Sequence, residues 1–96
     1  MQVYRYPIII SVSRRQGEVF DAADVYDDYF DIEFVDFHGA TEYGVAEENV
    51  EDVARKMLYE MICEYMEDNA KLPKPSTNPP RKLKKDEEFR VIQLIL

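Results

Sequence analysis

The chain has 96 residues, of which 46% are hydrophobic and 33% charged, and its formal net charge is −8. This length and composition predict one folded domain over residues 1–96 with a single core. The only cysteine excludes an internal disulfide and a cysteine-based zinc site, and it fits a reducing cytoplasm. No apolar run approaches the ~20 residues of a membrane-spanning helix, and the N-terminus lacks a signal-peptide core. We therefore expect a cytoplasmic protein that does not enter a membrane.

Two strands are predicted in the first half of the chain. Residues 3–12 place alternate apolar side chains on one side. Pro7 lacks an amide donor, so this strand is expected at a sheet edge or to begin near Pro7. Residues 29–37 also alternate, with one apolar and one largely acidic face. Residues 18–28 mix acidic and apolar side chains without a period, which predicts an acidic loop with a short strand or helical turn at residues 20–25.

A hairpin and a helix follow. His38 and Gly39 form a turn signal before a short third strand at residues 40–46. Residues 49–69 carry apolar side chains at helical spacing, which predicts an amphipathic helix of about six turns. Asn49 is expected to cap this helix, because its side-chain oxygen can accept a hydrogen bond from a first-turn amide.

The last part of the chain begins with prolines, which make residues 72–88 an extended, charged connection. Residues 89–96 are apolar on both faces, which predicts a last strand at the centre of the sheet or at a subunit contact and favours a homodimer. The order strand, strand, strand, helix, strand predicts an α+β fold. We expect a three-to-four-stranded, mainly antiparallel sheet with one long helix packed on one face.

The charge is unevenly distributed. No lysine or arginine lies between Arg15 and Arg55, where acidic residues are frequent, whereas residues 71–85 are basic. An acidic middle repels the phosphates of nucleic acids and attracts a basic partner. The alternative is that the surplus of acidic residues only keeps this small protein soluble.

Four landmarks of the chain follow one another in order. They are Tyr6-Pro7-Ile8-Ile9-Ile10, Asp36-Phe37-His38-Gly39-Ala40, Asn49-Val50-Glu51-Asp52-Val53-Ala54 and Leu72-Pro73-Lys74-Pro75-Ser76. Together they resemble the HicB antitoxin family of toxin–antitoxin systems. Val35 and His38 replace two prolines of the family's hairpin, and Ala40 replaces its cysteine. Many family members continue into a DNA-binding domain, which we do not expect in a chain that ends at Leu96.

The resemblance implies a partial RNase H-like fold and a binding protein without enzymatic activity or cofactor. Its partner would be HicA, a small basic mRNA-cleaving ribonuclease with a double-stranded-RNA-binding-like fold and a catalytic histidine. The antitoxin would cover the toxin's RNA-binding surface, with carboxylates where RNA phosphates would lie. The acidic stretch and the hairpin tip supply the candidate toxin contacts: Asp24, Asp27, Asp28, Asp31, Asp36, Phe37, His38 and Gly39.

Two other functions stay open. One is an acidic mimic of DNA or RNA that inhibits a different basic nuclease or regulator. The other is a metal-dependent nuclease, in which Asp31, Glu33 and Asp36 would hold Mg²⁺; alternate acids on a strand are more often a solvated face. We do not expect direct nucleic-acid binding by residues 81–85, because three acids follow them and no aromatic residue interleaves them.

Overall fold

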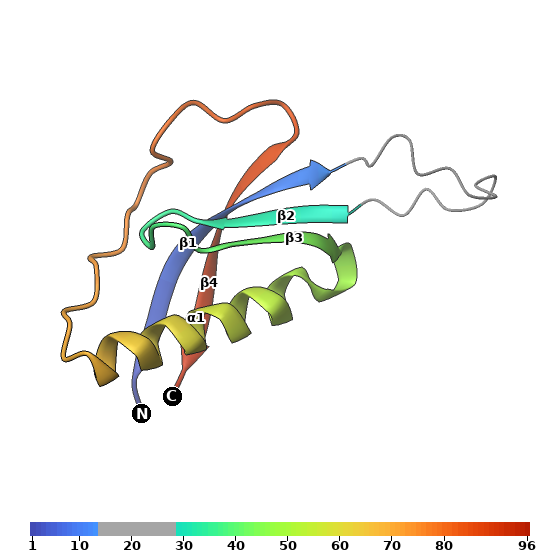
Figure 1. Ribbon diagram of the computed structural model, residues 1–96. Helices are drawn as coiled ribbons and strands as arrows, with labels where there is room; N and C mark the ends of the chain where they lie inside the picture. Colours follow the sequence, from blue (N-terminus) through green and yellow to red (C-terminus); the bar gives the residue numbers. More distant parts are fainter. Residues whose placement is uncertain (14–28) are drawn as a thin grey trace.

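The computed structural model describes residues 1–13 and 29–96, which form one antiparallel sheet crossed on one face by a long helix (Figure 1). The elements are β1 (Val3–Ser13), β2 (Tyr29–Phe34), β3 (Thr41–Ala46), the 3-10 turn η2 (Glu47–Asn49), α1 (Val50–Glu67) and β4 (Glu87–Ile95). The strand order is β3-β2-β1-β4, and each neighbouring pair is antiparallel. The predicted α+β fold is confirmed. The predicted acidic loop at residues 18–28 lies outside the described residues.

The core lies between α1 and one face of the sheet. Successive strand residues point to opposite faces, so β1 directs its even-numbered side chains toward the helix. Four of them are at most 8% exposed: Tyr4, Tyr6, Ile8 and Ile10. The helix contributes side chains every fourth residue, which keeps them on one side of it: Val50, Ala54, Leu58 and Ile62. The predicted helical and strand periodicities are therefore confirmed in the core.

Helix α1 starts differently from the prediction. Asn49 occupies the N-cap position, but its side chain makes no capping hydrogen bond. A side-chain cap needs an extended backbone at this position, and Asn49 is already helical (φ −107°, ψ −1°) because it ends η2. The prediction of an Asn49 side-chain cap is wrong. The 3-10 turn itself supplies a partner, since the N–H of Val50 donates to the carbonyl of Glu47.

Pro7 lies within a central strand, so its predicted place at an edge or strand start is wrong. Gln2 and Leu96 exchange backbone hydrogen bonds (2.7 and 2.9 Å). Alternation along an antiparallel ladder then turns the even-numbered amides of β1 toward β4 and the odd-numbered ones toward β2. The missing N–H of Pro7 faces β2 where that ladder ends, one residue before Ile8. The carbonyl of Pro7 still accepts from the N–H of Val35 (3.3 Å).

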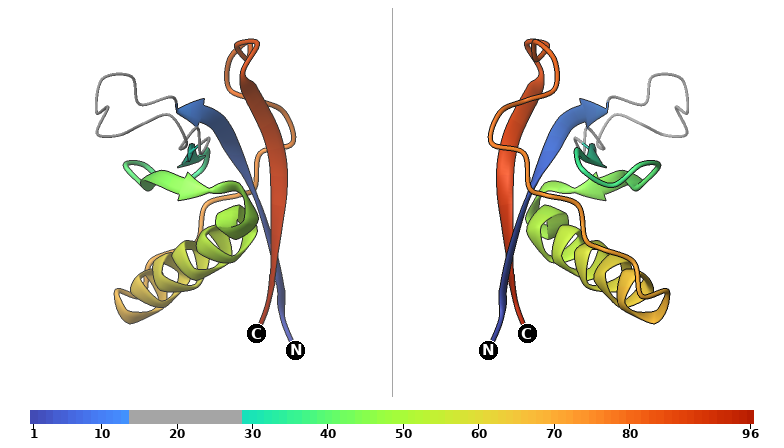
Figure 2. Two further views of the ribbon diagram at one scale, coloured as in Figure 1. Left: turned by 90° about the vertical axis from the view of Figure 1, so that its right-hand side faces the viewer. Right: turned by 90° about the vertical axis from the view of Figure 1, so that its left-hand side faces the viewer.

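Strand β4 lies at the edge of the sheet, beyond β1 (Figure 2). The alternative that placed residues 89–96 at the sheet centre is therefore wrong, whereas the subunit contact stays a prediction. The apolar pattern of residues 89–96 alone could not distinguish a central strand from a subunit contact. The position of β4 depends on its pairing with β1, which lies inside it in the sheet. On β4 the helix-facing Ile92 is buried, and Val91 and Ile95 on the opposite, outer face of the sheet are 53% and 52% exposed.

The connection from α1 to β4 has no helix or strand, and an ion pair ties it to the outer face. Arg81 donates to both carboxylate oxygens of Glu87 (2.6 and 2.8 Å), and it lies 3.7 Å from Glu33 of β2. These contacts reach from β2 to β4 across β1, whose outer-face residue Ile9 is 2% exposed. The Arg81 bond, with the N–H of Lys84, lowers the pKa of Glu87 from 4.5 to about 2.

Because the pKa of Glu87 is lowered in the folded protein, we expect the stability of the fold to depend on pH in the acidic range. A carboxyl whose pKa is lower in the folded state stabilises the fold above its unfolded value, and this contribution disappears as the pH falls. We expect the difference in unfolding free energy between wild type and Glu87→Gln to be constant above pH 4.5 and to vanish as the pH approaches about 2. Urea unfolding across this range measures it. The same comparison in an Arg81→Gln background should narrow this pH range, because only the bond from the Lys84 N–H is left to lower the pKa of Glu87. A difference that persists unchanged at low pH would contradict the assignment.

Candidate partner-binding surface

The predicted toxin-contact residues do not form one cluster. Asp24, Asp27 and Asp28 lie outside the described residues. Asp31 lies on the outer face of β2, where its Oδ1 accepts from the N–H of Gly44 (3.4 Å). Asp36 to Gly39 form the hairpin tip at the far end of β2 (Figure 1). Six strand residues span ~20 Å, so the tip is well separated from the start of β2.

Phe37 attaches the hairpin tip to the core. This ring is 3% exposed and packs against Tyr6, Phe34 and Tyr65, with ring centroids 4.8, 6.1 and 5.6 Å away. Phe37 thus holds the tip onto the core, and His38 and Gly39 are exposed. Gly39 has φ +76°, in the left-handed region that costs other residues conformational strain. The turn needs this glycine for its backbone, since no atom lies within 4 Å of an added Cβ.

Asp36 holds the connection that follows the helix. Its carboxylate accepts from the N–H of Ser76 (2.9 Å) and also from the Ser76 hydroxyl. Nearby, the Tyr6 hydroxyl donates to the carbonyl of Pro73 (2.5 Å). Burial, then the charge of Asp36, raises the pKa of Tyr6 above its ordinary value, which keeps the phenol protonated as a donor. Sequence reasoning missed the role of Ser76, although Asp36 and Ser76 both belong to its landmarks.

Helix α1 lines an open groove at each of its ends. The groove at the hairpin tip has a volume of about 270 Å³ and is lined by Phe37, His38, Gly39, Ala40, Met61, Glu64 and Tyr65. The groove at the start of α1 has a volume of about 370 Å³ and is lined by Ile10, Phe30, Glu47, Glu48, Val50, Glu51, Asp52, Arg55, Glu88 and Arg90. We call them the tip groove and the acidic groove. The second holds five carboxylates and two guanidinium groups above an apolar floor.

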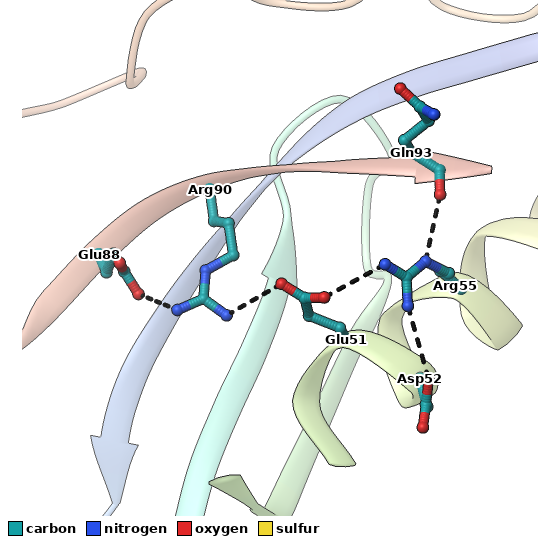
Figure 3. Close-up of polar contacts among 6 residues, drawn as sticks. All are labelled: Glu51, Asp52, Arg55, Glu88, Arg90 and Gln93. Atoms are coloured by element: carbon teal, nitrogen blue, oxygen red, sulfur yellow. Dashed lines mark hydrogen bonds and ion pairs between the residues drawn. The ribbon is translucent and has the colours of Figure 1, made fainter. Parts of the chain in front are cut away.

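Ion pairs join the walls of the acidic groove (Figure 3). Glu51 on α1 lies 3.2 Å from Arg55 on the same helix and 3.6 Å from Arg90 on β4. Arg90 also contacts Glu88 (2.6 Å), and the Nε of Arg55 donates to the Gln93 carbonyl (3.2 Å). Both guanidinium groups are therefore occupied by neighbours. Glu47 and Glu48 are exposed on η2 and have no ion pair within residues 1–13 and 29–96.

The described residues show neither a cluster of metal ligands nor a membrane-spanning helix. Asp31 and Glu33 share the outer face, as predicted, but Asp36 is bonded to Ser76. Among the described residues, no three His, Cys, Asp or Glu side chains are grouped as metal ligands would be. Within the same residues, no helix has the length and apolar character that crossing a bilayer requires.

Comparison with protein families gives one match. The model for the HicB-like antitoxin of bacterial toxin–antitoxin systems matches residues 19–89. This chain belongs to the HicB-like antitoxin family. No curated protein and no solved structure matches it. The matched region includes β2, β3, α1 and the connection, so the tip groove of this HicB-like chain lies entirely within it and the acidic groove lies mostly within it.

The bond between Asp36 and Ser76 predicts a specific loss of stability. Ser76→Ala removes a donor to a half-buried carboxylate, and hydrogen bonds to charged groups contribute about 1.5–3 kcal/mol. We expect a loss of that size in the free energy of unfolding, measured with urea. Thr77→Ala is the matched control, because the Thr77 hydroxyl is exposed and accepts only a long bond from Asn78 (3.4 Å). Equal stability of the two variants would contradict a structural role for Ser76.

Proposed function

We propose that this HicB-like chain neutralises a small basic ribonuclease toxin of the HicA type by covering the toxin's RNA-binding surface. The family match over residues 19–89 is the observation that carries the proposal. The chain then acts as a binding protein and not as an enzyme. Its place of action is the cytoplasm, where the toxin meets mRNA.

The acidic groove supports this proposal physically. A lysine or arginine of the toxin can lay its aliphatic stem on the half-buried Phe30 while its charged end reaches the carboxylates of the rim. Glu47 and Glu48 are the rim residues best placed for this, since they are exposed and Arg55 and Arg90 are paired with other acids. A net charge of −8 also steers a basic protein toward the domain.

The proposed contact surface therefore joins two sets of acids. Asp24, Asp27, Asp28 and Asp31 come from the sequence prediction, and the rim of the acidic groove comes from the structure. Figure 1 shows η2 and the start of β2 at the same end of the sheet. At this end Asp31 lies on the outer face of β2 and the rim lies on the helix side, so a toxin that contacts both sets would reach around this end of the sheet. His38 and Gly39 are exposed at the opposite end. Asp36 and Phe37 support that tip from within.

We also propose that the antitoxin is a homodimer. The support is the last part of β4, which is uncharged from Val91 onward yet lies at a sheet edge, where Val91 and Ile95 are exposed.

Co-expression tests the proposed activity. The small basic protein encoded beside this gene is expressed in bacteria with and without the chain, and growth and mRNA integrity are measured. We expect the chain to restore growth and to co-purify with the toxin. If the neighbouring gene encodes no small basic protein, or if growth is not restored, the HicA-type assignment is wrong. Inhibition of an unrelated basic nuclease in place of that toxin would support the nucleic-acid mimic.

Charge reversal locates the surface. We expect Glu47→Lys with Glu48→Lys to slow association with the toxin on the order of tenfold at low salt, because steering acts on the association rate. The effect should shrink at high salt, where surface charges are screened. Surface plasmon resonance at two salt concentrations measures both.

Two controls accompany this measurement. Glu60→Lys makes the same type of substitution on the exposed side of α1, and Glu64→Lys makes it in the tip groove, each with half the charge change of the η2 pair. Both should associate at nearly the wild-type rate. If Glu64→Lys slows association more than the η2 pair does, the toxin binds at the tip groove and the proposed surface is wrong.

A further inference from the structure

The outer edge of β4 presents unpaired backbone groups. Even-numbered residues of β4 bond to β1, as the Gln2–Leu96 pair shows, so odd-numbered residues turn their N–H and C=O groups outward. These residues are Phe89, Val91, Gln93 and Ile95. Among the described residues, the only one of these outward groups with a hydrogen-bond partner is the Gln93 carbonyl, which accepts from Arg55 (3.2 Å). A row of free amides and carbonyls is a template for another strand.

This edge lacks the features that normally prevent strand addition. Proteins protect their edges with charged residues, prolines and bulges, and residues 91–96 contain no charged residue and no proline. The other edge strand is protected. β3 has an irregular register opposite residues 30–32 and carries Glu42, and its most exposed apolar side chain is Tyr43 at 65%. The two edges of one sheet are thus built differently, which indicates that β4 is covered in the working protein.

Apolar side chains flank the β4 edge on both faces. Val91 and Ile95 are exposed on the outer face, next to Val3 of β1. On the helix side, Tyr59 lies one turn after Arg55, which places it on the side of α1 that reaches β4. A strand added here would therefore gain side-chain contacts above and below its backbone bonds, as in β-strand addition.

We propose that β4 pairs antiparallel with β4 of a second copy of this chain, about a two-fold axis at Gln93. In this register the outward-facing residues lie opposite one another, with Val91 of each copy opposite Ile95 of the other. The two sheets would join into one continuous sheet. The Gln93 carbonyl can keep its Arg55 bond, because a carbonyl oxygen accepts two hydrogen bonds.

Charge favours a second copy as the occupant. Two chains that each carry −8 repel one another, so they can approach only through a surface without acids. Residues 91–95 are uncharged, and the register about Gln93 leaves Glu87 and Glu88 outside the paired segment. A basic toxin is attracted instead by the acidic rim at the start of α1. The inference rests on the proposed homodimer and is independent of the proposed toxin contact.

Lysine substitutions at the edge test the pairing. We expect light scattering to give the wild type twice the 11.3 kDa chain mass, and Val91→Lys with Ile95→Lys the mass of one chain. Both side chains are half exposed, so the fold should persist, which circular dichroism checks. Tyr43→Lys on the other edge is the matched control and should stay dimeric. A monomeric wild type, or a double variant that is still dimeric, overturns the proposal.

Toxin binding separates this inference from the proposed function. The monomeric double variant should still bind and neutralise the toxin. If the wild type is monomeric and only the double variant loses the toxin, then β4 receives a strand of the toxin and the second copy is wrong. Failure of all variants, the wild type included, to bind a toxin would refute the proposed function without affecting the dimer.

A cysteine at the proposed axis tests the register. Directly opposite residues of a hydrogen-bonded antiparallel pair have Cα atoms ~5.5 Å apart, which fits a disulfide. In a Cys63→Ser background, Gln93→Cys should form a covalent dimer on mild oxidation, and Thr41→Cys on β3 should not. A dimer by light scattering that does not cross-link at residue 93 overturns the register.

Discussion

The fold depends on β1, which pairs with β2 on one side and with β4 on the other. Its helix-facing residues form one side of the core, and its backbone hydrogen bonds hold β2 on one side and β4 on the other. Pro7 has no backbone N–H to donate, and β1 tolerates it because it lies where the ladder with β2 ends. Tyr6, its neighbour, packs on Phe37 and donates to the carbonyl of Pro73. One short stretch of β1 therefore fixes the hairpin tip and the returning connection together.

Periodicity predicted the strands and the helix well. Burial of alternate side chains in a strand, or of every fourth one in a helix, leaves an apolar pattern within a short stretch of sequence. Periodicity could not predict which strands lie next to one another in the sheet. Pro7 in a central strand and an apolar segment at an edge both depend on pairing between residues far apart in the chain, such as Ile8 with Arg90. The helix cap failed for a local reason, since an additional 3-10 turn changed the backbone of Asn49 before α1 began.

The candidate site was predicted in part. The hairpin landmark identified an exposed turn at His38 and Gly39, but residue type alone could not show that Phe37 packs inward or that Asp36 is bonded to Ser76, 40 residues later. The acidic groove was not foreseen either. It joins η2, α1 and β4, and Glu88 and Arg90 come to Glu51 only after the long connection has brought the chain back to the sheet.

Strand β4 changes character along its length, and this separates two kinds of contact. Its first residues are charged: Glu88 and Arg90 line the acidic groove, and Glu87 holds the connection through Arg81. From Val91 onward it is uncharged and open at its edge. A basic partner and a like-charged second copy have opposite electrostatic requirements. In the two contacts that we propose, both partners would use this strand but on different segments of it, so binding of one would not exclude the other.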